Sequence, residues 1–300
     1  MRRGLRARFP FAGGAGVKRL TAFYFSGTGN TRYLTEWLSG LLAERYEVRK
    51  YALILSADGA ARAVPVPALG RGELAAAGIR RAVAESDLVL IAYPVYGSSP
   101  PLPVRRFLHT AGNAFKDKEI AVAATQYMFS GDGAAAAGRT AERYGGRVKY
   151  AEHFDMPNNL SDCRIFSVKN GEELRAMLDR TERKMEAFAR RILDGKPLRR
   201  GFNPVSHAVG YFCQRALWRR HENGKKDRLR IDPSRCTGCG LCAGNCPAAN
   251  LRVEKGKAVP AGRCILCYRC VNLCPVRAVT LLGAAPPAKQ YKGVPPAPRR

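Results

Sequence analysis

The sequence is poor in acidic residues and in long apolar segments. Its 300 residues include 24 Asp and Glu against 51 Lys and Arg, which gives a formal net charge of +27 at pH 7. No run of 18 or more apolar residues occurs, which argues against a membrane-spanning helix. The basic start of the chain is not followed by the apolar stretch of a secretory signal, so we expect a cytoplasmic protein.

Two common nucleotide-binding motifs are also missing. There is no Gly-Lys-Ser/Thr of a triphosphate-binding loop and no G-x-G-x-x-G of a dinucleotide fold. No nucleic-acid-binding motif accompanies the positive charge, which is densest in Arg219–Arg230, and we interpret this stretch as a solvated linker. The four histidines show no ligand spacing and are assigned no catalytic role: His109, His153, His207 and His221.

Cysteine, in contrast, is abundant and clustered. Eight of ten cysteines lie in two runs that both read C-x2-C-x2-C-x3-C-P, and 17 residues separate the last cysteine of the first run from the first of the second. Zinc sites usually space two Cys-x-x-Cys pairs apart, which makes zinc the weaker alternative. Three closely spaced thiolates instead suit three irons of one cubane, and the fourth cysteine, which opens a short helix, points to a second cluster.

This pattern resembles the bacterial two-cluster ferredoxins over residues 228–283. The resemblance implies two [4Fe–4S] clusters, each bound by three cysteines of one run and one of the other. Cluster one would take Cys236, Cys239, Cys242 and Cys274, and cluster two would take Cys264, Cys267, Cys270 and Cys246.

The rest of the chain alternates between strand and helix patterns. We expect strands near residues 20–25, 46–55, 87–93, 120–125 and 148–154, and helices near 31–42, 73–86, 104–111, 133–144 and 171–194. Residues 56–72, rich in Ala, Pro and Gly, are expected to form a loop. Such alternation predicts an α/β doubly wound parallel sheet.

The first strand runs directly into a loop of small and hydroxyl residues, Ser26-Gly-Thr-Gly-Asn-Thr31, followed by a helix. Glycines let the backbone approach an anion, hydroxyl groups donate hydrogen bonds to it, and the helix N-terminus supplies a positive potential. The segment therefore predicts a phosphate-binding loop, which we call loop one.

With this loop, about residues 18–195 resemble a flavodoxin, and the resemblance implies FMN at the carboxyl ends of the strands. Loop one would bind the phosphate through Ser26, Gly27, Thr28, Gly29, Asn30 and Thr31. Loop two, residues 93–99, would contribute Pro94, Val95, Tyr96 and Gly97, with Tyr96 against the flavin ring. Loop three, residues 126–133, would contribute Tyr127, Ser130, Gly131 and Gly133. A domain that kept the fold without FMN is the alternative.

Together the two parts resemble flavodoxin–ferredoxin fusions, an electron-carrier family of anaerobes. We divide the chain into a disordered basic tail (1–16), a flavodoxin-like domain (17–196), a basic amphipathic linker (197–227), a ferredoxin domain (228–283) and a disordered tail (284–300). Within the linker, residues 200–222 are expected to pack between the domains, with contact to a membrane surface as the alternative. Cys163 and Cys213 are expected to be buried, inert thiols rather than a redox pair.

The resemblance implies an electron relay between FMN, two clusters and other redox proteins. The positive charge favours acidic partners. The alternatives are an FMN-dependent reductase of a small substrate supplied with electrons by the clusters and, third, an iron–sulfur protein associated with nucleic acid.

Overall fold

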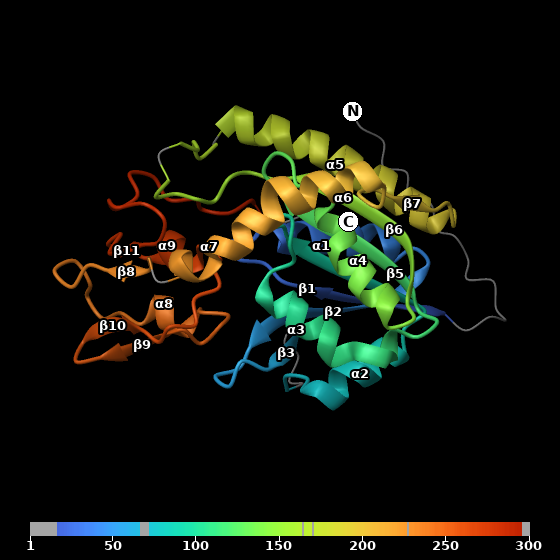
Figure 1. The fold of residues 1–300 in the computed structure, drawn as a ribbon, viewed down its shortest axis with the longest axis horizontal. Helices are drawn as coiled ribbons and strands as arrows, with labels where there is room; N and C mark the ends of the chain where they lie inside the picture. The colour runs from blue at the N-terminus through green and yellow to red at the C-terminus, as the bar shows by residue number, and fades with distance from the viewer. Residues whose placement is uncertain (1–16, 67–71, 164, 170, 227, 296–300) are drawn as a thin grey trace, which may run out of the picture.

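The computed structural model describes residues 17–66, 72–163, 165–169, 171–226 and 228–295. A layered α/β domain forms the larger part, and a small cysteine-rich domain lies beside it (Figure 1). The expected tail 1–16 lies outside the described residues. Within the described residues, no helix is both long and apolar enough to cross a membrane.

The large domain is built on a seven-stranded sheet with the order β3-β2-β1-β4-β5-β6-β7. Its five central strands are parallel, and their order β2-β1-β4-β5-β6 is the flavodoxin-like doubly wound order. The predicted α/β fold is thereby confirmed. The strands are β1 Lys18–Tyr24, β2 Tyr46–Leu55, β3 Ala61–Pro65, β4 Leu88–Pro94, β5 Glu119–Gln126, β6 Arg147–Asp155 and β7 Leu198–Arg199.

Two helical layers cover the sheet. On β4, Val89, Ile91 and Tyr93 belong to one apolar core, and the alternate residues Leu88, Leu90 and Ala92 belong to the other. This explains why β4 is a continuous apolar run, because both of its faces are buried. The first core is covered by α2 Ala76–Ala84, α3 Leu102–Ala111 and α4 Gly133–Arg143, and the second by α1 Asn30–Leu42 and α5 Gly171–Leu193. A 3₁₀ turn, Gly112–Phe115, follows α3.

One strand was not predicted. Residues 56–72 were expected to form a loop, but β3 pairs antiparallel with β2. Its short alternation places Ala61 and Ala63 in the core, while Arg62 points away from it. Alanine side chains give too weak a pattern to separate a strand from an Ala-rich loop, which is why the prediction was wrong here. Residues 67–71 lie outside the described part of the chain.

The segment between the domains is ordered and helical. After β7 has paired with β6, the chain forms α6 Pro204–Val209, a π-helical turn Gly210–Arg215 and α7 Ala216–Lys226. These three elements form a helical arm that runs from the sheet to the small domain (Figure 1). Residues 200–222 were expected to pack between the domains. Gln214 and Arg215 contact loops two and three, and Trp218 packs against the core of the small domain, but Val205 and Phe212 of the expected apolar face are exposed.

Eleven buried residues form the core of the small domain, which contains two pairs of antiparallel strands and two short helices. The elements are β8 Arg230–Ile231, α8 Leu241–Gly244, β9 Leu251–Glu254, β10 Lys257–Pro260, α9 Arg269–Leu273 and β11 Val279–Thr280.

Residues 284–295 are not a disordered tail, and that prediction was wrong. Gln290 and Tyr291 are buried, and the Gln290 amide donates to the carbonyl groups of Val271 and Cys274. The last five residues, 296–300, lie outside the described part.

Candidate functional site

Loop one joins β1 to α1 at the carboxyl edge of the sheet. Gly29 has φ +107°, a conformation that disfavours other residues, and it turns the chain into the helix. Its N–H donates to the Ser26 hydroxyl oxygen at 3.2 Å. The N–H groups of Gly27, Thr28, Asn30 and Thr31 have no acceptor among the described residues. Together with the helix N-terminus, they form a potential anion-binding cradle.

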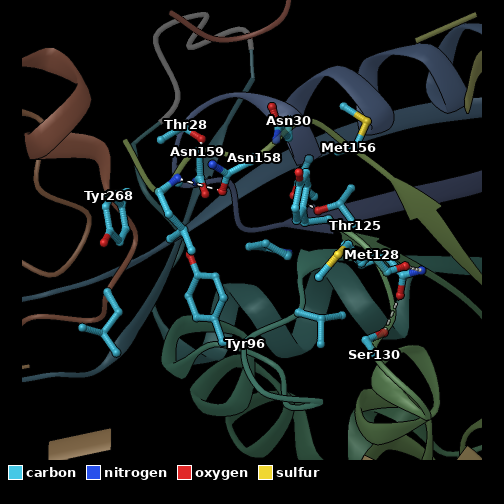
Figure 2. Close-up of a pocket in the computed structure, with 18 of the residues that line it drawn as sticks. Thr28, Asn30, Tyr96, Thr125, Met128, Ser130, Met156, Asn158, Asn159 and Tyr268 are labelled. Carbon is cyan, nitrogen blue, oxygen red and sulfur yellow. Dashed lines mark hydrogen bonds between the residues drawn. The ribbon is translucent and has the colours of Figure 1, made fainter. Parts of the chain in front are cut away.

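A cavity of about 300 Å³ opens beside loop one. Figure 2 shows Thr28, Thr125, Tyr96 and Ser130 around it, from three different strand ends. Eleven of the fourteen residues predicted to bind FMN line it: Ser26, Gly27, Thr28, Asn30, Thr31, Pro94, Val95, Tyr96, Gly97, Tyr127 and Ser130. Its size lies at the lower end of the range for cofactor pockets. We call it the loop cavity.

The other three predicted residues, all glycines, stand behind the wall of the loop cavity. A Cβ on Gly131 would lie 2.8 Å from the Gly210 backbone, and one on Gly133 would lie 2.7 Å from the Ser130 hydroxyl oxygen. Gly29 forms the turn described above. These glycines therefore shape the loops rather than face the cavity.

Several lining residues were not predicted. Residues 156–160 form one wall, where the Asn159 amide donates to the Thr28 hydroxyl oxygen at 2.9 Å. The Asn30 amide donates to the Pro157 carbonyl at 2.8 Å. Only their place directly after the last long strand could have indicated them, because that strand also ends at this edge. The remaining unpredicted residues are Thr125, Gln126, Met128, Phe129, Phe166, Gln214, Trp218, Leu266, Tyr268 and Leu282.

Tyr96 stands between the loop cavity and the small domain. Its ring lies 6.3 Å from that of Trp218 on the helical arm, and its buried hydroxyl has no hydrogen-bond partner among the described residues. Burial raises the pKa of Tyr96 well above its usual value, and the nearby Cys267 and Cys264 side chains add to the effect. Tyr96 is therefore a neutral phenol with an unused donor at physiological pH.

The cysteines of the two runs lie in the small domain. Cys236, Cys239, Cys242 and Cys274 line one small cleft, which we call the cluster one site. The Ala258 N–H donates to the Cys236 sulfur at 3.4 Å, and this bond and one from Gly238 lower the pKa of that thiol. The Ala278 N–H likewise donates to the Cys274 sulfur at 3.2 Å. Such bonds favour the thiolate that binds iron.

The other four cysteines form the cluster two site. Burial raises the pKa of Cys267 to about 12, and the charges of Cys246 and Cys264 add to it because those sulfurs lie nearby. The pKa of Cys270 is raised well above its usual value by burial and by the nearby Cys267, Cys264, Cys246 and Cys242. Iron binding must therefore displace protons from these thiols. Among the described side chains, no three His, Cys, Asp or Glu converge on the position of one metal ion.

The cluster two site and loop one share a wall. The Cβ that Gly27 lacks would lie 2.4 Å from the Cys267 carbonyl oxygen. The Arg269 guanidinium donates to the carbonyl groups of Gly27 and Ser26, at 2.8 and 2.6 Å. Leu266 and Tyr268, which flank Cys267, line the loop cavity. The peptide that carries a cluster two ligand thus also forms part of the cavity.

The two cysteines outside the runs differ in exposure. Cys163 is partly buried, but Cys213 is exposed on the helical arm, so the prediction of a buried thiol is wrong for Cys213. In the π-helical turn, Gly210 and Arg215 are the buried residues, and Cys213 lies on the exposed side of the turn.

Comparison with known proteins identifies the small domain. The family model of the 4Fe-4S dicluster domain matches residues 228–275. A ferredoxin from Pyrobaculum islandicum is 37% identical over 75 residues, which is 24% of this chain and 70% of that ferredoxin. These findings define an iron–sulfur protein with a dicluster domain. The chain belongs to the ferredoxin family through this domain.

Solved structures with a flavodoxin-like fold resemble the large domain. A WrbA-like flavodoxin from Agrobacterium tumefaciens is 16% identical, with a TM-score of 0.37 over 59% of this chain and 98% of its own. Flavodoxin 2 from Bacillus cereus is 14% identical, with a TM-score of 0.38 over 59% and 99%. General stress protein 14 from Treponema denticola, solved with FMN, is 14% identical, with a TM-score of 0.36 over 59% and 97%. These scores are too low to carry the assignment, which follows from the strand order. The chain thus joins a flavodoxin-like domain to a ferredoxin domain.

Proposed function

We propose that this protein is an electron-transfer flavoprotein with FMN in the loop cavity and two [4Fe–4S] clusters in the small domain. The observation that carries the proposal is the shared wall between loop one and the cluster two site, formed by Gly27, Cys267 and Arg269. Electron transfer needs closely spaced centres, and this wall leaves no room for another side chain between the two backbones.

The residues of the loop cavity fit FMN. Four backbone N–H groups of loop one remain available for the phosphate, and the Arg269 guanidinium adds positive charge behind the loop. Apolar and aromatic side chains, such as Tyr96, Trp218 and Met128, also line the cavity. When bound, FMN exchanges one or two electrons, whereas each cluster exchanges one.

The two cluster sites have different places in the proposed relay. Cluster two would be next to the flavin, because its ligand Cys267 lies against loop one. The cluster one site lies nearer the solvent, since Cys239 is exposed. Lys257 donates to the Cys236 carbonyl at this exposed end. We therefore infer that cluster one exchanges electrons with other redox proteins, and that acidic partners are favoured.

A reductase of a small substrate is the second candidate. It is favoured by the buried Tyr96 hydroxyl, which has no partner among the described residues and could donate a hydrogen bond to a bound molecule. A reductase would show saturable oxidation of the reduced protein by its substrate, whereas a carrier would react only with protein partners. Rapid mixing of reduced protein with small electron acceptors separates the two.

The proposed binding of the FMN phosphate by loop one can be tested by comparing the affinities for FMN and for riboflavin, which lacks the phosphate. Fluorescence titration of flavin-free protein should show that FMN binds at least roughly 100-fold more tightly, because several charge-assisted hydrogen bonds depend on the phosphate. Equal affinity for the two flavins would show that loop one does not bind phosphate. No affinity for either would remove the flavin from the proposal.

A further inference from the structure

A second cavity, separate from the loop cavity, lies between α3, α4 and the helical arm. Its volume is about 360 Å³. Four guanidinium groups line it, and we call it the arginine cavity: Arg105, Arg139, Arg143 and Arg215. The proposed relay uses none of these side chains.

The carboxylates beside the arginine cavity do not balance its positive charge. Arg139 and Arg215 share one carboxylate, that of the fully buried Asp132, and Arg105 pairs with Glu222 at 3.1 Å. Asp132 and Glu222 are thus the two carboxylates that pair with these guanidiniums. Glu142 also acts on Arg139, but its carboxylate pairs with Arg199, and Arg143 has no ion pair among the described residues. His207 also bonds to Asp132, at 2.8 Å. Burial and the charge of Arg215 lower the pKa of Arg139, a repulsion that a bound anion would relieve.

Two residues that line the arginine cavity each have a buried polar atom without a partner. The Ser99 hydroxyl oxygen and the Arg105 Nε have no hydrogen-bond partner among the described residues, and Ser99 is only 6% exposed. Buried polar groups in folded proteins are nearly always hydrogen-bonded, so these two donors point to a missing acceptor. The planar donor fork of arginine matches the oxygens of phosphate.

We propose that the arginine cavity binds the phosphate group of a phosphorylated small molecule, with Ser99, Arg105, Arg139 and Arg143 as its ligands. The cavity is larger than one phosphate needs, and Leu108 and Pro100 supply apolar walls for the rest of the molecule. Arg215 connects this site to loop two, because its guanidinium donates to the Ser98 carbonyl at 2.9 Å. This proposal does not depend on the presence of FMN.

Calorimetric titration of the purified full-length protein, as isolated with its cofactors, tests the site with pyrophosphate as the probe. We expect saturable binding that weakens with salt and falls about tenfold in Arg143→Gln and severalfold in Ser99→Ala. Arg106→Gln is the matched control, because this exposed arginine is the neighbour of Arg105 on α3 and does not line the cavity. It should bind pyrophosphate like the unaltered protein.

Three results would overturn the proposal. The first is no saturable binding, or binding that all variants share. The second is binding lost in Thr28→Ala but kept in Arg143→Gln, which would place the phosphate on loop one. The third is equal binding of malonate, which would show a site for any dianion rather than for phosphate. A circular dichroism spectrum of each variant distinguishes weakened binding from misfolding.

Discussion

The Cβ that Gly27 lacks would lie 2.4 Å from the carbonyl oxygen of Cys267, a residue 240 positions further along the chain. This approach brings the backbone of the flavodoxin-like domain against the backbone that carries a cluster two ligand. No other residue type fits at position 27 without a shift of one of the two loops, because the obstructing atom is backbone rather than a flexible side chain.

Gly27→Ala should therefore separate loop one from the cluster two site. We expect a loss of about 1–3 kcal/mol in the free energy of unfolding and at least a tenfold weaker affinity for FMN. The matched control is Gly40→Ala, since a Cβ there meets nothing within 4 Å and the exposed position lies within α1. That variant should gain about 0.5–1 kcal/mol. Equal behaviour of the two variants in denaturant titration would contradict the shared wall.

Arg269→Gln tests the charge behind loop one. The guanidinium donates to two loop carbonyl groups and brings a positive charge close to the proposed phosphate site. Its removal should weaken FMN binding roughly tenfold and leave riboflavin binding unchanged. Arg252→Gln, on the exposed strand β9, is the control and should alter neither. A parallel loss for both flavins would assign Arg269 a purely structural role.

The buried carboxylate of Asp162, in the loop after β6, holds two parts of the small domain. One oxygen accepts from the N–H groups of Leu281, Leu282 and Gly283, and the other accepts from the Tyr268 hydroxyl at 2.7 Å. In Asp162→Asn an amide N–H₂ would face some of these donors. We expect a loss of about 2–3 kcal/mol in unfolding free energy.

Thermal unfolding under anaerobic conditions measures this loss, and faster bleaching of the clusters by a chelator should accompany it. Asp179→Asn is the control, because its carboxylate forms an exposed ion pair with Arg175 on α5. Removal of such a pair should change stability by less than about 1 kcal/mol. An Asp162→Asn variant as stable as the control would refute this role of Asp162.

Acid should destabilise the protein through His153. Burial lowers the pKa of His153 to about 4, and its Nε2 accepts the Ala134 N–H at 2.9 Å, so the ring must stay neutral. The unfolded chain, with the usual His pKa near 6.5, binds more protons between pH 6.5 and 4. Stability must therefore fall as the pH falls through this window.

His153→Gln removes this titration. We expect the stability of the unaltered protein to decline by about 2 kcal/mol more than that of the variant between pH 7.5 and 5. Comparing the two proteins cancels the acid lability that their clusters share. Identical pH profiles in thermal unfolding would show that His153 is not held neutral.

The sequence predicted features encoded by neighbouring residues, but it did not predict contacts between residues far apart along the chain. The apolar run of β4 and the glycine and hydroxyl pattern of loop one led to the correct fold and to most of the loop cavity, because each signal lies within a few neighbouring residues. In contrast, the contact of Gly27 with Cys267 and the position of Trp218 on the cavity wall depend on how separate elements pack. No local pattern encodes such contacts.

Composition also failed to predict the ordered C-terminal segment, residues 284–295. Its Pro, Ala and Lys content is typical of disorder, yet two side chains hold it in place. The Tyr291 hydroxyl bonds to the Asn30 side chain in loop one, and Gln290 bonds to α9 and the residue after it. Composition averages over a segment and so overlooks individual anchors of this kind.

The most direct measurement of the proposed relay is an anaerobic reductive titration of the purified protein, with iron, sulfide and released flavin quantified. Two cubanes and one flavin require about eight irons, eight sulfides and one FMN. We predict that reductant added in steps bleaches the cluster and flavin bands in every molecule, and that Gly27→Ala slows the electron exchange between them. Eight irons without flavin, even after incubation with FMN, would contradict the account and leave a ferredoxin joined to a structural α/β domain.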